Sequence, residues 1–176
     1  GKIFLNRRIN YWRKKSYKNV RIIDTFDDRF NILWEKYLNQ NSEILCFNRS
    51  QQSLTWHYGH LIKNKGWVIV HESDGIMDGY IICIAKKNNG LTKMVVVDLV
   101  VVAEFSEPIY EALLLRSAKE ASDRGYDIFE LVGFNKKIKK YFYNLKPFTR
   151  RFSLCPYLYK TDHENLKIPL SKEEHW

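Results

Sequence analysis

The chain has 176 residues, of which 45% are hydrophobic, and it carries a formal net charge of +9. This length and composition allow one full hydrophobic core, so we expect a single globular domain. No apolar stretch approaches the roughly 20 residues that span a bilayer, and the basic N-terminus lacks the apolar run of a signal peptide. The sequence therefore excludes a membrane span, and we expect a cytoplasmic protein.

The positive charge is concentrated in two segments. Residues 1–21 hold eight Lys or Arg, residues 136–151 hold seven, and neither segment has an acid. Three cysteines, Cys46, Cys83 and Cys155, are far apart and flanked by apolar residues, which favours reduced core thiols over disulfides or a zinc site. We expect no bound metal. Residues 1–21 are interpreted as a basic leader or a connection from another domain, and residues 22–176 as one domain.

The first half of that domain predicts two helices and an antiparallel meander. The segment Asp24-Thr25-Phe26-Asp27-Asp28 supplies an N-cap, and Phe26, Phe30, Leu33, Trp34 and Tyr37 recur at the spacing of one helical face. A short strand is expected at 43–48 and a helix at 50–60. Strands follow at 67–72 and 80–86, joined by a glycine-rich loop over 73–79, and a tight turn at 88–90 leads to the next strand.

The second half is organised around a βαβ unit. The β-branched run at 94–102 is too apolar to face water on either side, an amphipathic helix is expected at 109–124, and a second apolar strand at 128–134. Ligands of such units lie where the strand ends meet the helix N-terminus, so we expect the functional site between Leu99 and Tyr110. A basic, aromatic helix at 136–145 and a strand at 152–160 complete the expected elements.

This order of elements, over residues 21–160, resembles that of the GNAT acyltransferases. The resemblance implies an α/β (α+β) GNAT-like acyltransferase fold, with a mixed central sheet in which an antiparallel meander precedes the βαβ unit. In some GNAT-like proteins the domain is the C-terminal half of a tandem pair, so a second GNAT-like domain on the N-terminal side is an expected partner. The residues that carry the resemblance are Phe26-Asp27-Asp28-Arg29-Phe30 with Leu33-Trp34, Arg49 with Leu54-Thr55-Trp56-His57-Tyr58, and Asp78-Gly79-Tyr80-Ile81.

The resemblance also implies acetyl-CoA as co-substrate. The family's Arg/Gln-x-x-Gly-x-Gly/Ala loop, whose backbone N–H groups bind the coenzyme pyrophosphate, aligns with residues 105–110. Phe105 stands in place of the Arg, and Pro108 and Tyr110 in place of the glycines. Proline removes a donor and tyrosine adds bulk, so the phosphate cradle is degenerate. The residues expected at the coenzyme are Leu99, Val100, Val101, Ser106, Ile109, Tyr110, Asn135 and Lys139.

The expected catalytic residues are two carboxylates and two tyrosines. Asp98 and Glu104 are the carboxylates available to take a proton from an amine, and the family's acid tyrosine falls on Phe142, with Tyr141 and Tyr143 on either side. Asp98 stands alone in an apolar run, so its carboxylate must reach the rim of the sheet, pair with another group or have a raised pKa. The alternative to a functional role is an ordinary hydrogen-bonded acid at a sheet irregularity. Residues expected to line the acceptor pocket are Trp56, Tyr58 and Tyr80, although Trp56 and Tyr58 are also read as core aromatics.

Two functions remain open from the sequence. The first is a GNAT-type N-acyltransferase that moves an acetyl group from acetyl-CoA to a small-molecule or peptide amine. The second is a non-catalytic GNAT-like module that has lost coenzyme binding and recognises a partner or substrate. The lysines of residues 136–140 are read as a solvated face, a coenzyme-phosphate contact or a polyanion contact. Nucleic acid is not the expected partner, because no recognition motif accompanies the basic segments.

Overall fold

The computed structural model describes residues 18–41, 46–102, 106–131, 134 and 136–143, and for residues 136, 137, 142 and 143 it describes the backbone alone. The helices are α2 (Arg29–Gln40), α3 (Gln51–Lys63), α4 (Ser106–Asp123) and α5 (Lys136–Tyr143). The strands are β1 (Val20–Ile23), β2 (Trp67–Ser73), β3 (Ile76–Asn88), β4 (Leu91–Val101) and β5 (Ile128–Leu131). None of the described helices is long and apolar enough to cross a membrane.

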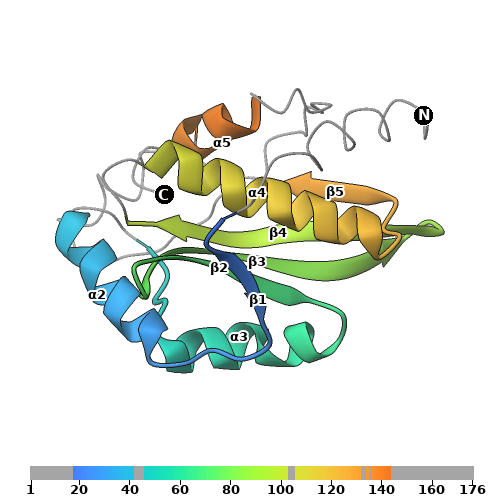
Figure 1. The fold of residues 1–176 in the computed structure, drawn as a ribbon. Helices are drawn as coiled ribbons and strands as arrows, with labels where there is room; N and C mark the ends of the chain where they lie inside the picture. The colour runs from blue at the N-terminus through green and yellow to red at the C-terminus, as the bar shows by residue number, and fades with distance from the viewer. Residues whose placement is uncertain (1–17, 42–45, 103–105, 132–133, 135, 144–176) are drawn as a thin grey trace, which may run out of the picture.

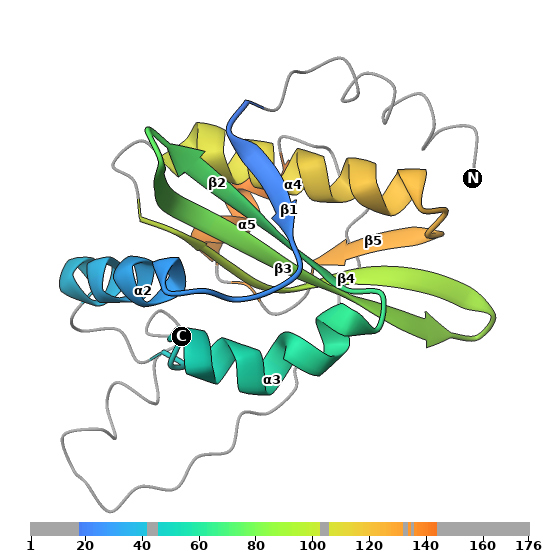
Figure 2. The ribbon, with the colours of Figure 1, turned by 60° about the horizontal axis from the view of Figure 1, so that its bottom comes forward.

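The five strands form one sheet in the order β1-β2-β3-β4-β5. Strands β1 to β4 are antiparallel to their neighbours, whereas β4 and β5 are parallel and are joined through α4. Helix α4 covers one face of the sheet, with α5 beside it, and α2 and α3 cover the other face (Figures 1 and 2). The mixed sheet and the βαβ unit confirm the predicted fold class.

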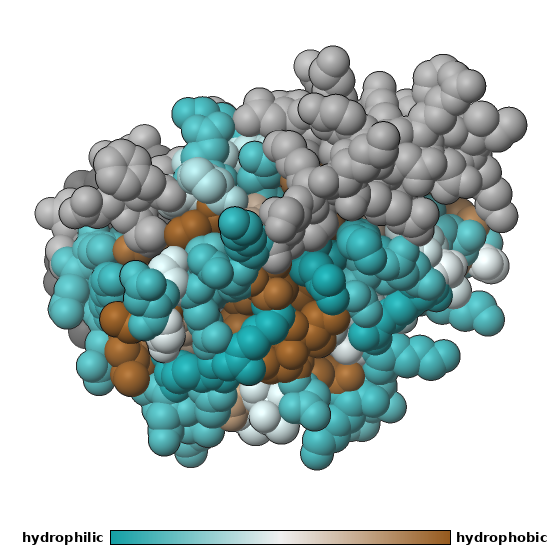
Figure 3. Space-filling view, in the orientation of Figure 1, coloured by the Kyte–Doolittle hydropathy of each residue, from teal (hydrophilic) through white to brown (hydrophobic). Residues whose placement is uncertain are grey.

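Each face of the sheet carries its own hydrophobic cluster. Along β2, Trp67 and Ile69 pack toward α4, whereas Val68 and Val70 pack toward α2 and α3. This alternation follows from the two-residue period of a strand. In the view of Figure 3, apolar side chains gather at the centre of the molecule, over the β1 edge of the sheet, within a hydrophilic surround.

Both hairpins close in two-residue turns, as predicted at 88–90 but more tightly than predicted at 73–79. Asp74 and Gly75 have φ of 51° and 78°, and Asn89 and Gly90 have φ of 48° and 78°. Two successive positive φ angles characterise the two-residue turns that match the twist of a hairpin. The expected loop over 73–79 is therefore a two-residue turn, and β3 begins at Ile76.

The remaining differences are one strand that was missed, one expected strand that is absent over its described residues, and one helix that begins earlier. Strand β1 was not predicted, since four residues are too few to show a period. The expected strand at 43–48 is not present over residues 46–48, because the Asn48 side chain accepts from the Ser50 N–H at 2.8 Å and the backbone turns into α3 there. Helix α4 begins at Ser106 rather than Ile109, since a proline is tolerated in the first turn. The expected strand at 152–160 lies outside the described residues.

A β-bulge divides β4 into two halves. Ile82 of β3 pairs with Asp98, but the next residue, Cys83, pairs with Val96, so that Val97 is the extra residue. Met94 and Val96 face α4 before the bulge, and so do Leu99 and Val101 after it. Residues with even numbers face α4 before the bulge, and residues with odd numbers face α4 after it. Val97 and Asp98 therefore lie together on the α2/α3 face.

Candidate functional site

The parallel strands β4 and β5 pair over only part of their length. Their register runs from Lys93 opposite Ile128 to Val96 opposite Leu131, whereas β4 continues to Val101. In the part of the chain that the structure describes, no strand pairs with β4 beyond Val96 on this edge. The backbone groups of residues 99–101 on this edge therefore have no described strand partner, and a ligand with amide groups could pair with them as an added strand does.

Asp98 lies at the bulge and is 5% exposed. Its carboxylate accepts from Nε of Arg49 at 3.0 and 3.1 Å and from Nη2 of Arg49 at 3.1 Å, and it accepts from the Tyr80 hydroxyl at 2.7 Å. Of the three outcomes that the sequence left open for this carboxylate, the structure shows pairing, at an irregularity of the sheet. A carboxylate with these donors is held in one orientation, because the bonds converge from two different elements.

Arg49 lies between that carboxylate and a group of aromatic rings. Its guanidinium carbon is 5.9 Å from the ring centres of Trp34 and Tyr37 and 6.0 Å from that of Phe47, within the range of cation–π attraction. Its Nη1 donates to the Phe47 carbonyl at 3.1 Å. Burial alone would lower the pKa of Arg49, but the charge of Asp98, the hydrogen bonds to it and the nearby Tyr80 and Tyr37 together more than offset burial, so the pKa is raised. No local pattern in the sequence indicates that these two residues pair, since they are 49 residues apart.

The three residues expected at the acceptor lie in three different environments. Tyr80 has no exposed surface, and burial followed by the charge of Asp98 raises the pKa of its hydroxyl. Its side chain therefore supports Asp98 from inside the core and does not reach a substrate. Tyr58 is partly buried against the α2/α3 cluster, and burial raises its pKa as well. Trp56 is 79% exposed, so the alternative reading of it as a core aromatic was wrong.

The expected coenzyme residues of α4 lie in its first turns. Ser106 is partly buried at the start of the helix, and Ile109 is buried against the α4-side core. Tyr110 is also buried, and its ring stacks on Tyr141 of α5 at 4.5 Å between ring centres, with 13° between the planes. Burial raises the pKa of Tyr110. The bulk of Tyr110 is thus placed in the core between α4 and α5.

The other predicted residues are described only in part. Lys139 is exposed on α5, and Tyr141 is half-buried. Tyr143 belongs to α5, but its side chain is outside the described set, and Glu104 and Asn135 lie outside the described residues altogether. Cys83 is a free, buried thiol, as predicted, Cys46 is free and partly buried, and Cys155 is not among the described residues. Within the described ranges, no group of three or more His, Cys, Asp or Glu is placed to hold a metal.

Sequence reasoning missed a second buried polar group, which lies near the end of β4. Asp78, at a bulge of β3, is bonded to Nδ1 of His71 at 2.6 Å and accepts from the Ser73 hydroxyl at 2.6 Å. Its backbone carbonyl accepts from the Val102 N–H at 2.9 Å. These bonds fix the residue from which the chain leaves β4 for α4. The two buried acidic residues of the described strands, Asp78 and Asp98, thus both hold the geometry of β4.

Solved structures of acetyltransferases share this arrangement. An aminoglycoside acetyltransferase from an uncultured soil metagenomic sample, in complex with trehalose, matches with a TM-score of 0.60 at 13% identity, over 81% of this chain and 95% of that one. A predicted acetyltransferase with acetyl-CoA from Clostridium acetobutylicum matches with a TM-score of 0.61 at 15% identity, over 82% and 99%. The chain has the GNAT acetyltransferase fold.

A third GNAT-fold structure widens the range of acceptors among the similar proteins. The ribosomal-protein-alanine N-acetyltransferase from Brucella melitensis biovar Abortus 2308 matches with a TM-score of 0.56 at 15% identity, over 80% of this chain and 99% of that one. Neither a family model nor a curated protein matches the sequence. At these identities the likeness establishes the fold, and the activity has to be argued from the site.

Proposed function

We propose that this protein is a GNAT-type N-acyltransferase that moves an acetyl group from acetyl-CoA to an amine. The observation that carries the proposal is the edge of β4 beyond Val96, which no strand of the described residues pairs with and which leads to the first turn of α4. A pantetheine arm contains amide groups that can pair with the backbone of Leu99, Val100 and Val101 as a short strand would. The solved acetyltransferase with acetyl-CoA that shares this fold supports the choice of coenzyme.

The chemistry requires positioning and two proton transfers. The amine nitrogen attacks the acetyl carbonyl carbon, a C–N bond forms, and the C–S bond breaks to release the coenzyme thiolate. Tyr141 or Tyr143 of α5 would give that thiolate a proton, and Glu104 or Asp98 would take the proton from the amine, directly or through water. Because the Asp98 carboxylate already accepts from Arg49 and Tyr80, we favour Glu104 for the base and assign Asp98 to holding the strand.

The second candidate is a GNAT-like module without coenzyme binding, and one observation favours it. Pro108 occupies the first turn of α4, where a bound pyrophosphate would need backbone N–H donors. A weaker cradle lowers coenzyme affinity before it lowers the intrinsic rate of transfer.

Thermal unfolding with and without millimolar acetyl-CoA tests the proposal. A ligand at a hundredfold excess over its Kd adds roughly 2.7 kcal/mol, which raises the midpoint by roughly 5–10 °C for a domain of this size. The variant Pro108→Ala restores one N–H without the freedom of glycine, so it should give a larger rise than the wild-type chain. An equal concentration of ATP serves as the nucleotide control. No rise with either chain, or the same rise with ATP, would refute the enzyme and favour the module.

A further inference from the structure

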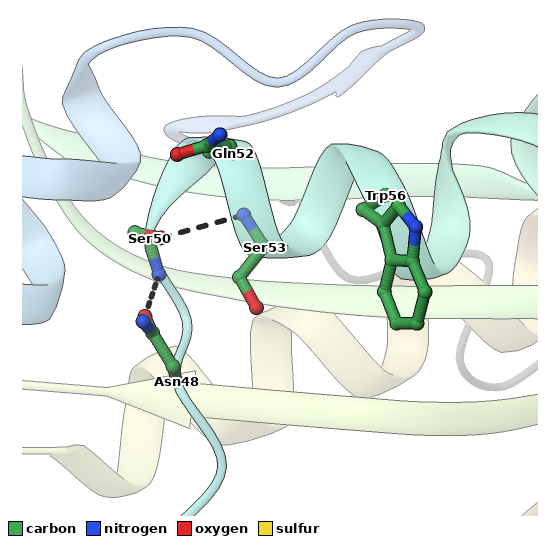
Figure 4. A pocket seen from close by; sticks show the side chains of 5 residues that line it. All are labelled: Asn48, Ser50, Gln52, Ser53 and Trp56. Carbon is green, nitrogen blue, oxygen red and sulfur yellow. Dashed lines mark hydrogen bonds between the residues drawn. The ribbon is translucent and has the colours of Figure 1, made fainter.

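An open hollow of about 300 Å³ lies at the N-terminal half of α3 and the residues just before it. Its wall consists of Asn48, Ser50, Gln52, Ser53 and Trp56 (Figure 4). Four of these five side chains are uncharged amides or hydroxyls, and the fifth is an indole. None of them is charged, so the lining of this hollow offers no ionic partner to an anion or to a cation.

The polar wall offers hydrogen bonds that the protein uses only in part. Asn48 accepts from the Ser50 N–H through Oδ1, and Ser50 accepts from the Ser53 N–H at 3.3 Å, which fixes both side chains. In these bonds the Asn48 amide nitrogen and the Ser50 hydroxyl hydrogen remain available as donors. Among the described residues, the side chains of Gln52 and Ser53 form no hydrogen bond with another group. The hollow therefore presents both hydrogen-bond donors and hydrogen-bond acceptors to a ligand.

The indole of Trp56 has an unusual placement for so large an apolar group. It is 79% exposed, the largest exposed fraction among the large hydrophobic side chains of the described residues. It is not isolated, because its ring meets His57 edge to face at 4.4 Å and 79°, and His57 meets Phe47 at 4.4 Å and 75°. The exposed face of the indole is therefore open to a ligand beside a small group of aromatic rings.

From these features we infer that the hollow binds a sugar ring, stacked on Trp56 and hydrogen-bonded by Asn48, Ser50, Gln52 and Ser53. A pyranose combines an apolar C–H face with a rim of hydroxyl groups, and it carries no charge. The wall has the matching parts: an exposed aromatic surface and uncharged donors and acceptors. Shallow, water-filled sites of this kind bind weakly, and we expect a Kd in the millimolar range. The inference rests on the hollow alone and does not depend on acetyl transfer.

Side-chain NMR tests the site directly. The indole N–H signals of the five tryptophans are followed while N-acetylglucosamine is added, and the Trp56 signal is assigned from the spectrum of Trp56→Phe. The proposal expects the Trp56 signal and the side-chain amides of Asn48 and Gln52 to shift along one saturating curve in the millimolar range. Trp56→Ala should weaken binding at least tenfold. Since Trp56 is mostly exposed, this variant should remain folded, which its backbone amide spectrum verifies.

Two controls separate a sugar site from other causes of a shift. Ile76→Ala removes another exposed apolar side chain, 60% exposed and far along the chain on β3, and it should leave the Kd unchanged within twofold. Glycerol at the same molarity of hydroxyl groups should produce no saturating shift. The inference is overturned if no shift appears at 100 mM sugar, if glycerol reproduces the shifts, or if Trp56→Ala binds with the wild-type Kd.

Discussion

Removing Arg49 should cost far more stability than removing an exposed arginine that makes an equally short ion pair. In Arg49→Met the apolar stem is kept, but Asp98, which is 5% exposed, loses its only described cationic partner. Breaking a buried pair in this way costs about 3–5 kcal/mol. The Arg49 side chain is 18% exposed and Tyr80 still donates to the carboxylate, so we expect the lower end, about 3 kcal/mol. For a chain of this size that corresponds to a drop of roughly 6–12 °C in Tm.

The matched control is Arg21→Met. Arg21 donates to Glu72 at 2.8 Å, but its side chain is 53% exposed, and such pairs contribute under about 1 kcal/mol. Urea unfolding followed by tryptophan fluorescence measures both variants, and Asp98→Asn in the wild-type and Arg49→Met backgrounds completes a double-mutant cycle. The cycle should give a coupling energy above about 1 kcal/mol. Equal losses for the two arginine variants, or a coupling energy near zero, would show that the pair does not hold β4.

Two further predictions concern the core. Alanine at Gly79 would place its Cβ 3.1 Å from the Val100 carbonyl oxygen, so Gly79→Ala should lower the free energy of unfolding by about 1–3 kcal/mol in urea titration. Gly59→Ala in α3, whose Cβ meets Thr55 at an ordinary 3.5 Å, should instead be neutral or stabilising by up to about 1 kcal/mol, and the opposite order would contradict the packing described. Burial raises the pKa of the Cys83 thiol from 9.0 to about 12. The contribution of this thiol to the free energy of unfolding is therefore fully present below pH 9 and decreases as the pH rises from 9 toward 12. Cys83→Ala should lose less stability over that range than the wild-type chain, and an unchanged pH profile would exclude the thiol as a cause.

The sequence predicted the elements that have a clear period or a clear boundary. The βαβ unit was recognised because a β-branched run, an amphipathic segment and a second apolar run follow one another. Both hairpin turns were located by their glycines, although the glycine-rich loop over 73–79 was expected to be longer than the Asp74-Gly75 turn. Strand β1 was missed because its place in the sheet depends on pairing with residues 68–71 of β2.

The site was predicted less well, because its contacts join distant parts of the chain. Pairing was one of the outcomes expected for Asp98 as a lone acid in an apolar strand, yet nothing near it in the sequence identifies Arg49. Tyr80 was expected at the substrate, but the sequence could not show on which face of the sheet, or how deeply, it lies. The expected roles of Leu99, Val100 and Val101 depend on where β5 ends, which is a property of the folded sheet, and these roles stay predictions.

The bulge at Val97 also bears on how this strand can change. In a sheet with one solvent-exposed face, a one-residue shift of register turns every core side chain that follows it toward solvent. Here both faces are covered by helices and the residues of β4 around the bulge are nearly all aliphatic, so the second half of the strand could exchange faces without placing a polar group in the core. Asp98 is the exception, and its bonds to Arg49 and Tyr80 select one of the two registers. A chain lacking Val97 would keep Val96 opposite Cys83 and Asp98 opposite Ile82, so it is expected to fold with a continuous β4 in which Asp98 stays on the α2/α3 face with both of these partners.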